Sequence, residues 1–248
     1  MPRIKLELAY TGSDFHGWQL QPEQRTVQGV LEQALQRICN TRIRVHGAGR
    51  TDAGVHALGQ VAHADLPEEK AHVPWQKALN ALLPDDVAVM RASWCGPDFH
   101  ARFGAQAKEY TYTLWLEKSY VLPQRRPFVW SVGGLGLQAM QDAAWALQGR
   151  RDFRAFQNVG TRVRSTVREL RRIEFCQGFY AQELVVSFVA DGFLKQMARN
   201  LASCLVAAGQ GKLDINGLRS IMESGQRELA PATAPARGLC LRRIWYPE

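Results

Sequence analysis

The 248-residue sequence predicts an α+β protein in which a βαββαβ order of elements occurs twice. Short segments alternate apolar and polar residues, as half-buried strands do, and longer segments space their apolar residues three or four apart, as helices do. Hydrophobic residues make up 46% of the chain, which is enough for one large core or two smaller ones. We therefore expect a globular protein with an N-terminal half over residues 1–105 and a C-terminal half over residues 106–248.

The first half carries signals for four strands and two helices. Thr26 is expected to cap the first helix, whose apolar positions continue at helical spacing to Ile38. Pro74 opens the second helix and Pro84 stops it. The strands are expected at residues 4–9, 42–45, 59–64 and 87–92.

The second half repeats this order, with helices expected at residues 137–147 and 194–208. Its strands are expected at residues 110–116, 167–176, 183–190 and 239–245. Each half would form an antiparallel sheet with helices on one face, which is the RRM-like or ferredoxin-like arrangement. We expect the two sheets to lie side by side around a basic active-site cleft.

A glycine-rich loop joins the two middle strands of the first half and reads GAGRTDAGVH over residues 47–56, hereafter the Asp52 loop. Its single carboxylate, Asp52, is flanked by small residues that let a bulky substrate approach the backbone. Arg50 is suited to keep that carboxylate charged or to grip a phosphate. Asp is also a common turn former. The loop lacks the patterns that bind dinucleotides or nucleotide phosphates, so we expect Asp52 to act as a nucleophile or base without a nucleotide cofactor.

Other residue types exclude several classes of protein. The five cysteines are scattered and form no Cys-x-x-Cys pair, so we expect reduced core thiols. The histidines lack the spacing of metal ligands, and we expect no metal site. The longest uncharged run, residues 127–141, is too short to span a bilayer, and the N-terminus lacks the apolar core of a signal peptide. We expect a cytoplasmic protein that does not bind membranes.

The positive charge of the chain, +8 in total, is concentrated in one segment. Residues 150–172 hold eight arginines and two acidic residues, a net charge of +6. Arginine is the side chain that best matches phosphate oxygens, so we expect Arg162, Arg164 and Arg168 to contact RNA. The alternative is a solvated strand face.

Several motifs occur in a definite order along almost the whole chain. They are AYTGSDFHGWQ at 9–19 (the opening motif) with TVQ at 26–28, GAGRTDAGVH at 47–56, FHARF at 99–103 with KEYTY at 108–112, DF at 152–153 with Phe156, FLKQMARN at 193–200, and AP at 234–235 with GL at 238–239. In this order they resemble the TruA family of tRNA pseudouridine synthases. Gly104 departs from a usual serine, and Lys195-Gln196 replaces a commoner histidine-rich pair. Neither departure touches the carboxylate.

The resemblance implies a reaction and a set of roles. It implies conversion of uridine to pseudouridine at positions 38, 39 and 40, in the anticodon stem-loop of tRNA, by a homodimer. It assigns catalysis to Asp52, paired with Arg199, and packing against the target uracil to Tyr110. It implies that Arg50 helps to displace the base from its stack.

The reaction breaks the bond from C1′ to N1 and joins C1′ to C5 without loss of electrons, so it needs no cofactor. It needs an ionised carboxylate, which either attacks C1′ or removes the 2′ proton. The sequence leaves both routes open. The alternative for Tyr110 is a plain strand aromatic. Without the resemblance, the sequence favours a helix-surface role for Arg199. Two rival functions are a non-catalytic RNA-binding protein and a hydrolase with an Asp nucleophile, although the latter usually needs a second acid or a metal.

Overall fold

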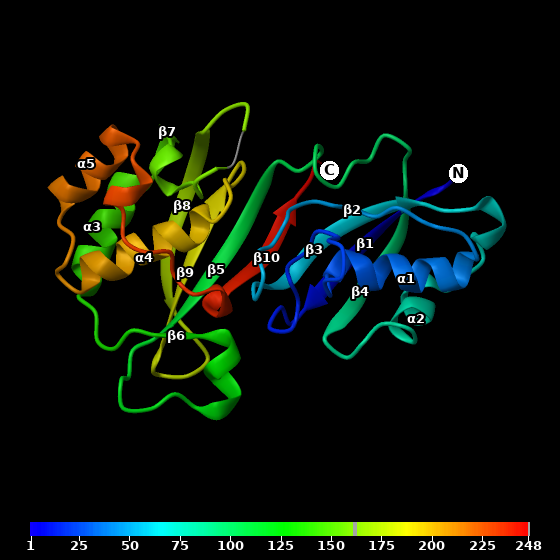
Figure 1. The fold of residues 1–248 in the computed structure, drawn as a ribbon, viewed down its shortest axis with the longest axis horizontal. Coiled ribbons are helices and arrows are strands. Elements are labelled where there is room, and N and C mark those ends of the chain that lie inside the picture. Colours follow the sequence, from blue (N-terminus) through cyan, green and yellow to red (C-terminus); the bar gives the residue numbers. More distant parts are fainter. Residues whose placement is uncertain (161–162, 248) are drawn as a thin grey trace. The chain divides into compact units, whose positions relative to one another are not determined.

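The computed structural model describes residues 1–160 and 163–247, which divide into two compact units (Figure 1). The first unit contains Met1–Gln106 together with the C-terminal stretch that starts at Cys240. The second unit contains Ala107–Leu239. Most of strand β10 (Leu239–Trp245) therefore belongs to the first unit, whereas the sequence analysis assigns this strand to the second half.

The sheet of the first unit is mostly antiparallel. Strand β1 (Arg3–Tyr10) pairs antiparallel with β3 (His56–Asp65) and β4 (Val87–Cys95), and every second residue of β1 is buried. The short β2 (His46–Gly47) pairs antiparallel with β3, and β10 pairs parallel with β3. The Asp52 loop thus connects β2 to β3, and β3 pairs with β1, β2 and β10.

The predicted strand at residues 42–45 is wrong, because the structure begins β2 at His46. The physical reason lies at Val45, whose backbone groups bond to side chains instead of a strand. Its N–H donates to Glu32 Oε1 at 3.0 Å, and its carbonyl accepts from Gln28 Nε2 at 3.2 Å.

Two helices belong to the first unit, and the longer one, α1 (Val27–Cys39), lies against one face of the sheet (Figure 1). The predicted cap is confirmed, since Thr26 Oγ1 accepts from the N–H of Gly29 at 3.2 Å. Helix α2 (Trp75–Asn80) starts after Pro74, as predicted. Leu31 and Leu35 of α1 are fully buried, so the apolar face of α1 forms the core with the sheet.

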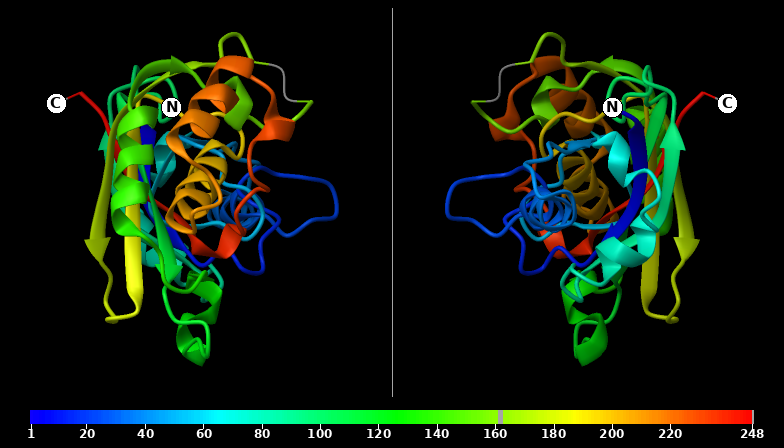
Figure 2. Two further views of the ribbon diagram at one scale, coloured as in Figure 1. Left: turned by 90° about the vertical axis from the view of Figure 1, so that its left-hand side faces the viewer. Right: turned by 90° about the vertical axis from the view of Figure 1, so that its right-hand side faces the viewer.

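The second unit holds mostly antiparallel sheet strands in the order β5-β9-β8-β7, with β6 parallel to β5. Its strands are β5 (Ala107–Trp115), β6 (Trp130–Ser131), β7 (Gly149–Asp152), β8 (Val167–Gln177) and β9 (Glu183–Ala190). Helices lie on one face of this sheet, as Figure 2 shows. They are α3 (Leu137–Leu147), α4 (Met197–Gly209) and α5 (Ile215–Ser224).

The structure adds helical segments that the sequence analysis did not assign. Helix α5 has local signals, because Asp214 accepts from the N–H of Gly217 and Gly225 ends the helix in the left-handed conformation. Short 3-10 helices lie at Glu68–Lys70, Pro123–Phe128, Arg154–Phe156, Arg227–Leu229 and Ala236–Gly238. None of the helices in residues 1–160 and 163–247 has the length and apolar character that crossing a membrane requires.

The cysteines are free thiols, but only two of them lie in the core. Cys39 and Cys204 are buried, as predicted. The prediction is wrong for Cys176. This residue lies near the end of β8, where Cys176 and Gln177 are both exposed to solvent.

Candidate active site

Hydrogen bonds to buried side chains hold the Asp52 loop in place. Gln60, fully buried on β3, donates from Nε2 to the carbonyl of Gly49 at 2.7 Å. The hydroxyls of Tyr10 and Thr51 form a hydrogen bond of 2.8 Å. Burial raises the pKa of the Tyr10 hydroxyl further above neutral pH. The loop therefore has a rigid base, while Asp52 itself is half-buried.

The opening motif supports the same loop from one side. The N–H of Trp18 donates to the carbonyl of Thr51 at 3.0 Å, and the N–H of Gly12 donates to His56 Nδ1 at 3.0 Å. Gly17 has a φ of +87°, and a Cβ on it would lie 2.5 Å from the oxygen of Thr51. The close approach of the two segments thus requires glycine at this position.

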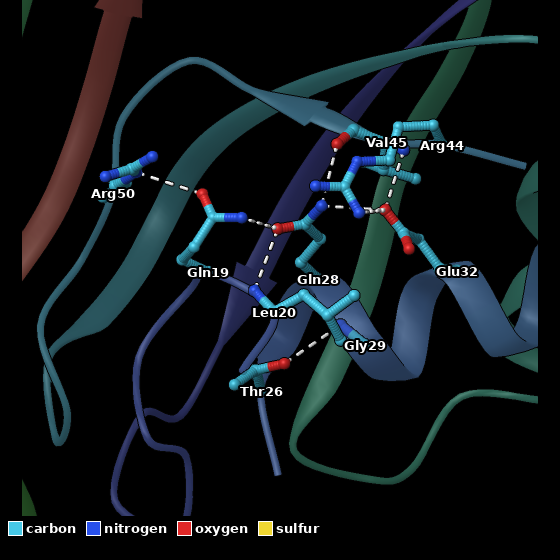
Figure 3. Close-up of polar contacts among 9 residues, drawn as sticks. All are labelled: Gln19, Leu20, Thr26, Gln28, Gly29, Glu32, Arg44, Val45 and Arg50. Atoms are coloured by element: carbon cyan, nitrogen blue, oxygen red, sulfur yellow. Dashed lines mark hydrogen bonds and ion pairs between the residues drawn. The ribbon is translucent and has the colours of Figure 1, made fainter. Parts of the chain in front are cut away.

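Arg50 is exposed at the start of the loop, where its Nε donates to Gln19 Oε1 at 3.0 Å (Figure 3). Gln19 belongs to the opening motif, so this motif also contacts the predicted substrate-binding arginine. The sequence places Gln19 in the opening motif but predicts no role for it. Its only sequence signal was that membership.

Tyr110 lies on β5 in the second unit and is 6% exposed. Its ring packs edge-on against Phe193, with the ring centres 4.9 Å apart and the planes at 78°. Tyr112, two residues along the strand, is fully buried and donates its hydroxyl to the carbonyl of Pro235 at 2.6 Å. Tyr112 is therefore a core residue with a polar anchor, and Tyr110 has an aromatic partner of its own.

Arg199 lies in the first turn of α4 and is half-buried. Its Nε donates to the carbonyl of Ala234 at 2.7 Å. The segment around Ala234 is fixed in turn, because Thr233 donates its hydroxyl to Oδ1 of the buried Asn200 at 2.8 Å. Arg227 donates to the same oxygen at 2.9 Å. Sequence reasoning did not find this cluster, whose members lie far apart along the chain.

The four residues predicted to act on the uridine thus divide between the units. Asp52 and Arg50 come from the first unit, and Tyr110 and Arg199 come from the second. Among residues 1–160 and 163–247, histidine, cysteine and acidic side chains form no group of three that could hold a metal ion.

Three arginines of the arginine-rich segment are paired with nearby acids. These ion pairs join Arg154 to Asp152, Arg171 to Glu169 at 3.1 Å, and Arg172 to Glu174 at 3.3 Å. Arg164 is exposed, and Arg168 is half-buried and donates to the carbonyl of Ser165 at 3.0 Å. Arg162, the other predicted RNA contact, lies outside the described residues.

Comparison with known proteins agrees with the order of the motifs. The profile of the family described as tRNA pseudouridine synthase matches residues 8–104 and 143–247. A relative from Maridesulfovibrio salexigens, named tRNA pseudouridine synthase A, is 51% identical over 100% of this chain and 92% of its own length. A relative of the same name from Solidesulfovibrio magneticus is 53% identical over 99% of this chain and 92% of its own length.

Among solved structures, the Nop10-Cbf5 complex of the archaeal box H/ACA sRNP has a TM-score of 0.34 and 14% identity. The alignment covers 83% of this chain and 53% of that chain. The match to the family profile and the two relatives, each aligned over at least 92% of its own length, is sufficient to show the family of this chain. The chain belongs to the tRNA pseudouridine synthase family, which is a family of isomerases.

Proposed function

We propose that this enzyme isomerises uridine to pseudouridine at positions 38, 39 and 40 in the anticodon stem-loop of tRNA, with Asp52 as the catalytic carboxylate. The observation that carries the proposal is the presentation of Asp52, which is half-buried on a loop fixed by Gln60 and Tyr10. A reacting group held on a rigid support loses little freedom when the substrate binds. The relatives' shared name, tRNA pseudouridine synthase A, supports tRNA as the substrate.

In the proposed reaction Asp52 either attacks C1′ or removes the 2′ proton. Arg199 pairs with the carboxylate, because an acid covered by a nucleobase loses water and is otherwise harder to ionise. Tyr110 stacks on the target uracil, and its hydroxyl serves in the proton transfer from C5. Arg50 helps to displace the base from its stack, a step that costs a few kcal/mol.

The proposed assembly places two ferredoxin-like sheets side by side around a basic cleft into which the Asp52 loop reaches. The N-terminal half supplies the catalytic loop, and the C-terminal half supplies phosphate contacts from Arg162, Arg164 and Arg168. The reaction itself needs no cofactor. The active form is a cytoplasmic homodimer in which one subunit holds the body of the tRNA and the other presents Asp52.

Release of tritium from tRNA labelled at uracil C5 tests this proposal, because formation of the bond from C1′ to C5 expels the label. Wild-type protein should release tritium from tRNA that carries uridine at position 38, 39 or 40 and none when all three are cytidine. Asp52→Asn should bind tRNA and release no label, whereas Asp85→Asn, a change at an exposed acid, should behave as wild type. Binding without release by the wild type would favour a non-catalytic RNA-binding protein.

A further inference from the structure

A chain of hydrogen bonds connects Arg50 to a buried carboxylate in α1 (Figure 3). Arg50 Nε donates to Gln19 Oε1 at 3.0 Å, Gln19 Nε2 donates to Gln28 Oε1 at 2.8 Å, and Gln28 Nε2 donates to Glu32 Oε1 at 2.8 Å. Gln28 and Glu32 are 2% and 8% exposed, whereas Arg50 is exposed. All four residues belong to the first unit, and the chain leads from its core to the Asp52 loop.

Backbone groups fix the direction of the amide of Gln28. The N–H of Leu20 donates to Gln28 Oε1 at 3.0 Å, while Gln28 Nε2 also donates to the carbonyl of Val45 at 3.2 Å. A backbone N–H can only donate and a carbonyl can only accept, so rotation of this amide by 180° would break both bonds. The carboxylate of Glu32, an acceptor only, enforces the same direction.

The direction of Gln28 determines that of Gln19. Because Gln28 presents its oxygen, Gln19 must present its NH₂ group, and the oxygen of Gln19 then faces Arg50. The Nε–H of arginine can only donate, so the final bond fits this polarity and no other. The bond uses Nε and leaves the two terminal nitrogens to donate to a ligand.

We propose that Gln19 and Gln28 are positioning residues that hold the guanidinium of Arg50 in advance of RNA binding, with its terminal nitrogens set for the RNA. This inference rests on the proposed function, in which Arg50 contacts the substrate. An exposed arginine otherwise samples many rotamers and loses that freedom when the RNA binds. The chain of hydrogen bonds restricts the rotamers of Arg50 already on folding. Less conformational entropy is then lost when the RNA binds, which favours the productive complex.

The first test is a double-mutant cycle between Gln19 and Arg50. Gln19→Met keeps the length of the side chain and removes both of its hydrogen bonds, and it should lower kcat/KM for tRNA by about tenfold. In an Arg50→Ala protein, the same change should cause no further loss. Gln28→Met should act in the same direction without touching Arg50, and Gln36→Met, at an exposed position of the same helix, should have no effect.

The second test observes Arg50 without RNA. The NMR signal of its Nε–H, identified by its loss in Arg50→Lys, should exchange slowly with water in wild type and faster in Gln19→Met and Gln28→Met. If Gln19→Met unfolds within a few degrees of the wild-type melting temperature, loss of the fold is excluded as the cause of faster exchange. If Gln28→Met does not fold, Gln19→Met is sufficient for the test.

The proposal would be overturned if the Nε–H of Arg50 exchanged equally slowly in Gln19→Met and wild type. It would also be overturned if Gln19→Met lowered kcat/KM equally in the presence and absence of Arg50. Faster exchange together with full activity of Arg50→Ala would also overturn it, because an oriented Arg50 would then serve no purpose in the reaction. Failure of the proposed function is seen separately, as an absence of tritium release by wild type or as activity of Asp52→Asn.

Discussion

Arg199 donates its Nε to the carbonyl oxygen of Ala234 at 2.7 Å, so a backbone acceptor fixes the direction of this half-buried guanidinium. The acceptor is itself held, because the neighbouring residues Thr233 and Pro235 are hydrogen-bonded to Asn200 and Tyr112. Both predicted functional arginines, Arg50 and Arg199, are therefore anchored through Nε to oxygen acceptors within their own units.

Replacing Arg199 by methionine should reduce turnover far more than tRNA binding, by about 100-fold in single-turnover experiments. Arg219→Met, at an exposed position of α5, is the matched control. A loss of tRNA affinity with intact single-turnover chemistry would make Arg199 a phosphate contact instead.

Two changes at Tyr110 should separate stacking from proton transfer. Tyr110→Phe keeps the ring against Phe193 and should bind tRNA normally while it turns over slowly. Tyr110→Ala also removes the stacking surface, which is typically worth about 1–3 kcal/mol per base, and should weaken binding as well. Single-turnover rates and binding constants measure the two effects. Wild-type behaviour of Tyr110→Ala would show that the residue is purely structural.

The salt dependence of tRNA binding should distinguish the arginines of the basic segment. Arg164→Ala and Arg168→Ala should each flatten the slope of log binding constant against log salt concentration by about 0.7 to 0.9. Fewer counterions are released on binding when a phosphate contact is lost. Arg171→Ala should change the slope less, since Arg171 is paired with Glu169 at 3.1 Å. Titrations over a salt series provide the measurement, and slopes equal to wild type in all variants would identify a solvated face.

Acidification should destabilise the first unit through His63, which is 2% exposed. Burial, together with the charges of His100, Arg3 and His46, lowers the pKa of His63 to about 4. Below about pH 6.5 His63 binds a proton in the unfolded chain but stays neutral in the folded chain. The free energy of unfolding should therefore fall between about pH 6.5 and pH 4, by up to about 3 kcal/mol. His63→Gln should flatten this decline in urea unfolding. A decline as steep as that of wild type would assign it to other groups.

Gly17→Ala should destabilise the Asp52 loop by about 1–3 kcal/mol. The added Cβ would lie 2.5 Å from the oxygen of Thr51, and the φ of +87° disfavours any side chain. Gly96→Ala is the matched control, because nothing lies within 4 Å of its Cβ. Thermal unfolding compares the two, and equal stability would show that the opening motif can move away from the loop.

Local signals determined most of the elements. The bounds predicted for the helix at residues 137–147 and for the strands at residues 183–190 and 239–245 are confirmed. In each case the residues that set the pattern lie within the element, so periodicity is sufficient. The strand predicted at 42–45 failed because Gln28 and Glu32, distant in sequence, take the hydrogen bonds of Val45.

The sequence by itself determined the family, the glycine-rich setting of Asp52 and the concentration of arginines. Only the tertiary structure decided that β10 pairs with β3, that Gln60 and Tyr10 support the Asp52 loop, and that Gln19 orients Arg50. It also decided that acids neutralise part of the arginine segment. These relationships join residues through hydrogen bonds and ion pairs whose geometry depends on the folded backbone, and such contacts leave no periodic pattern along the chain.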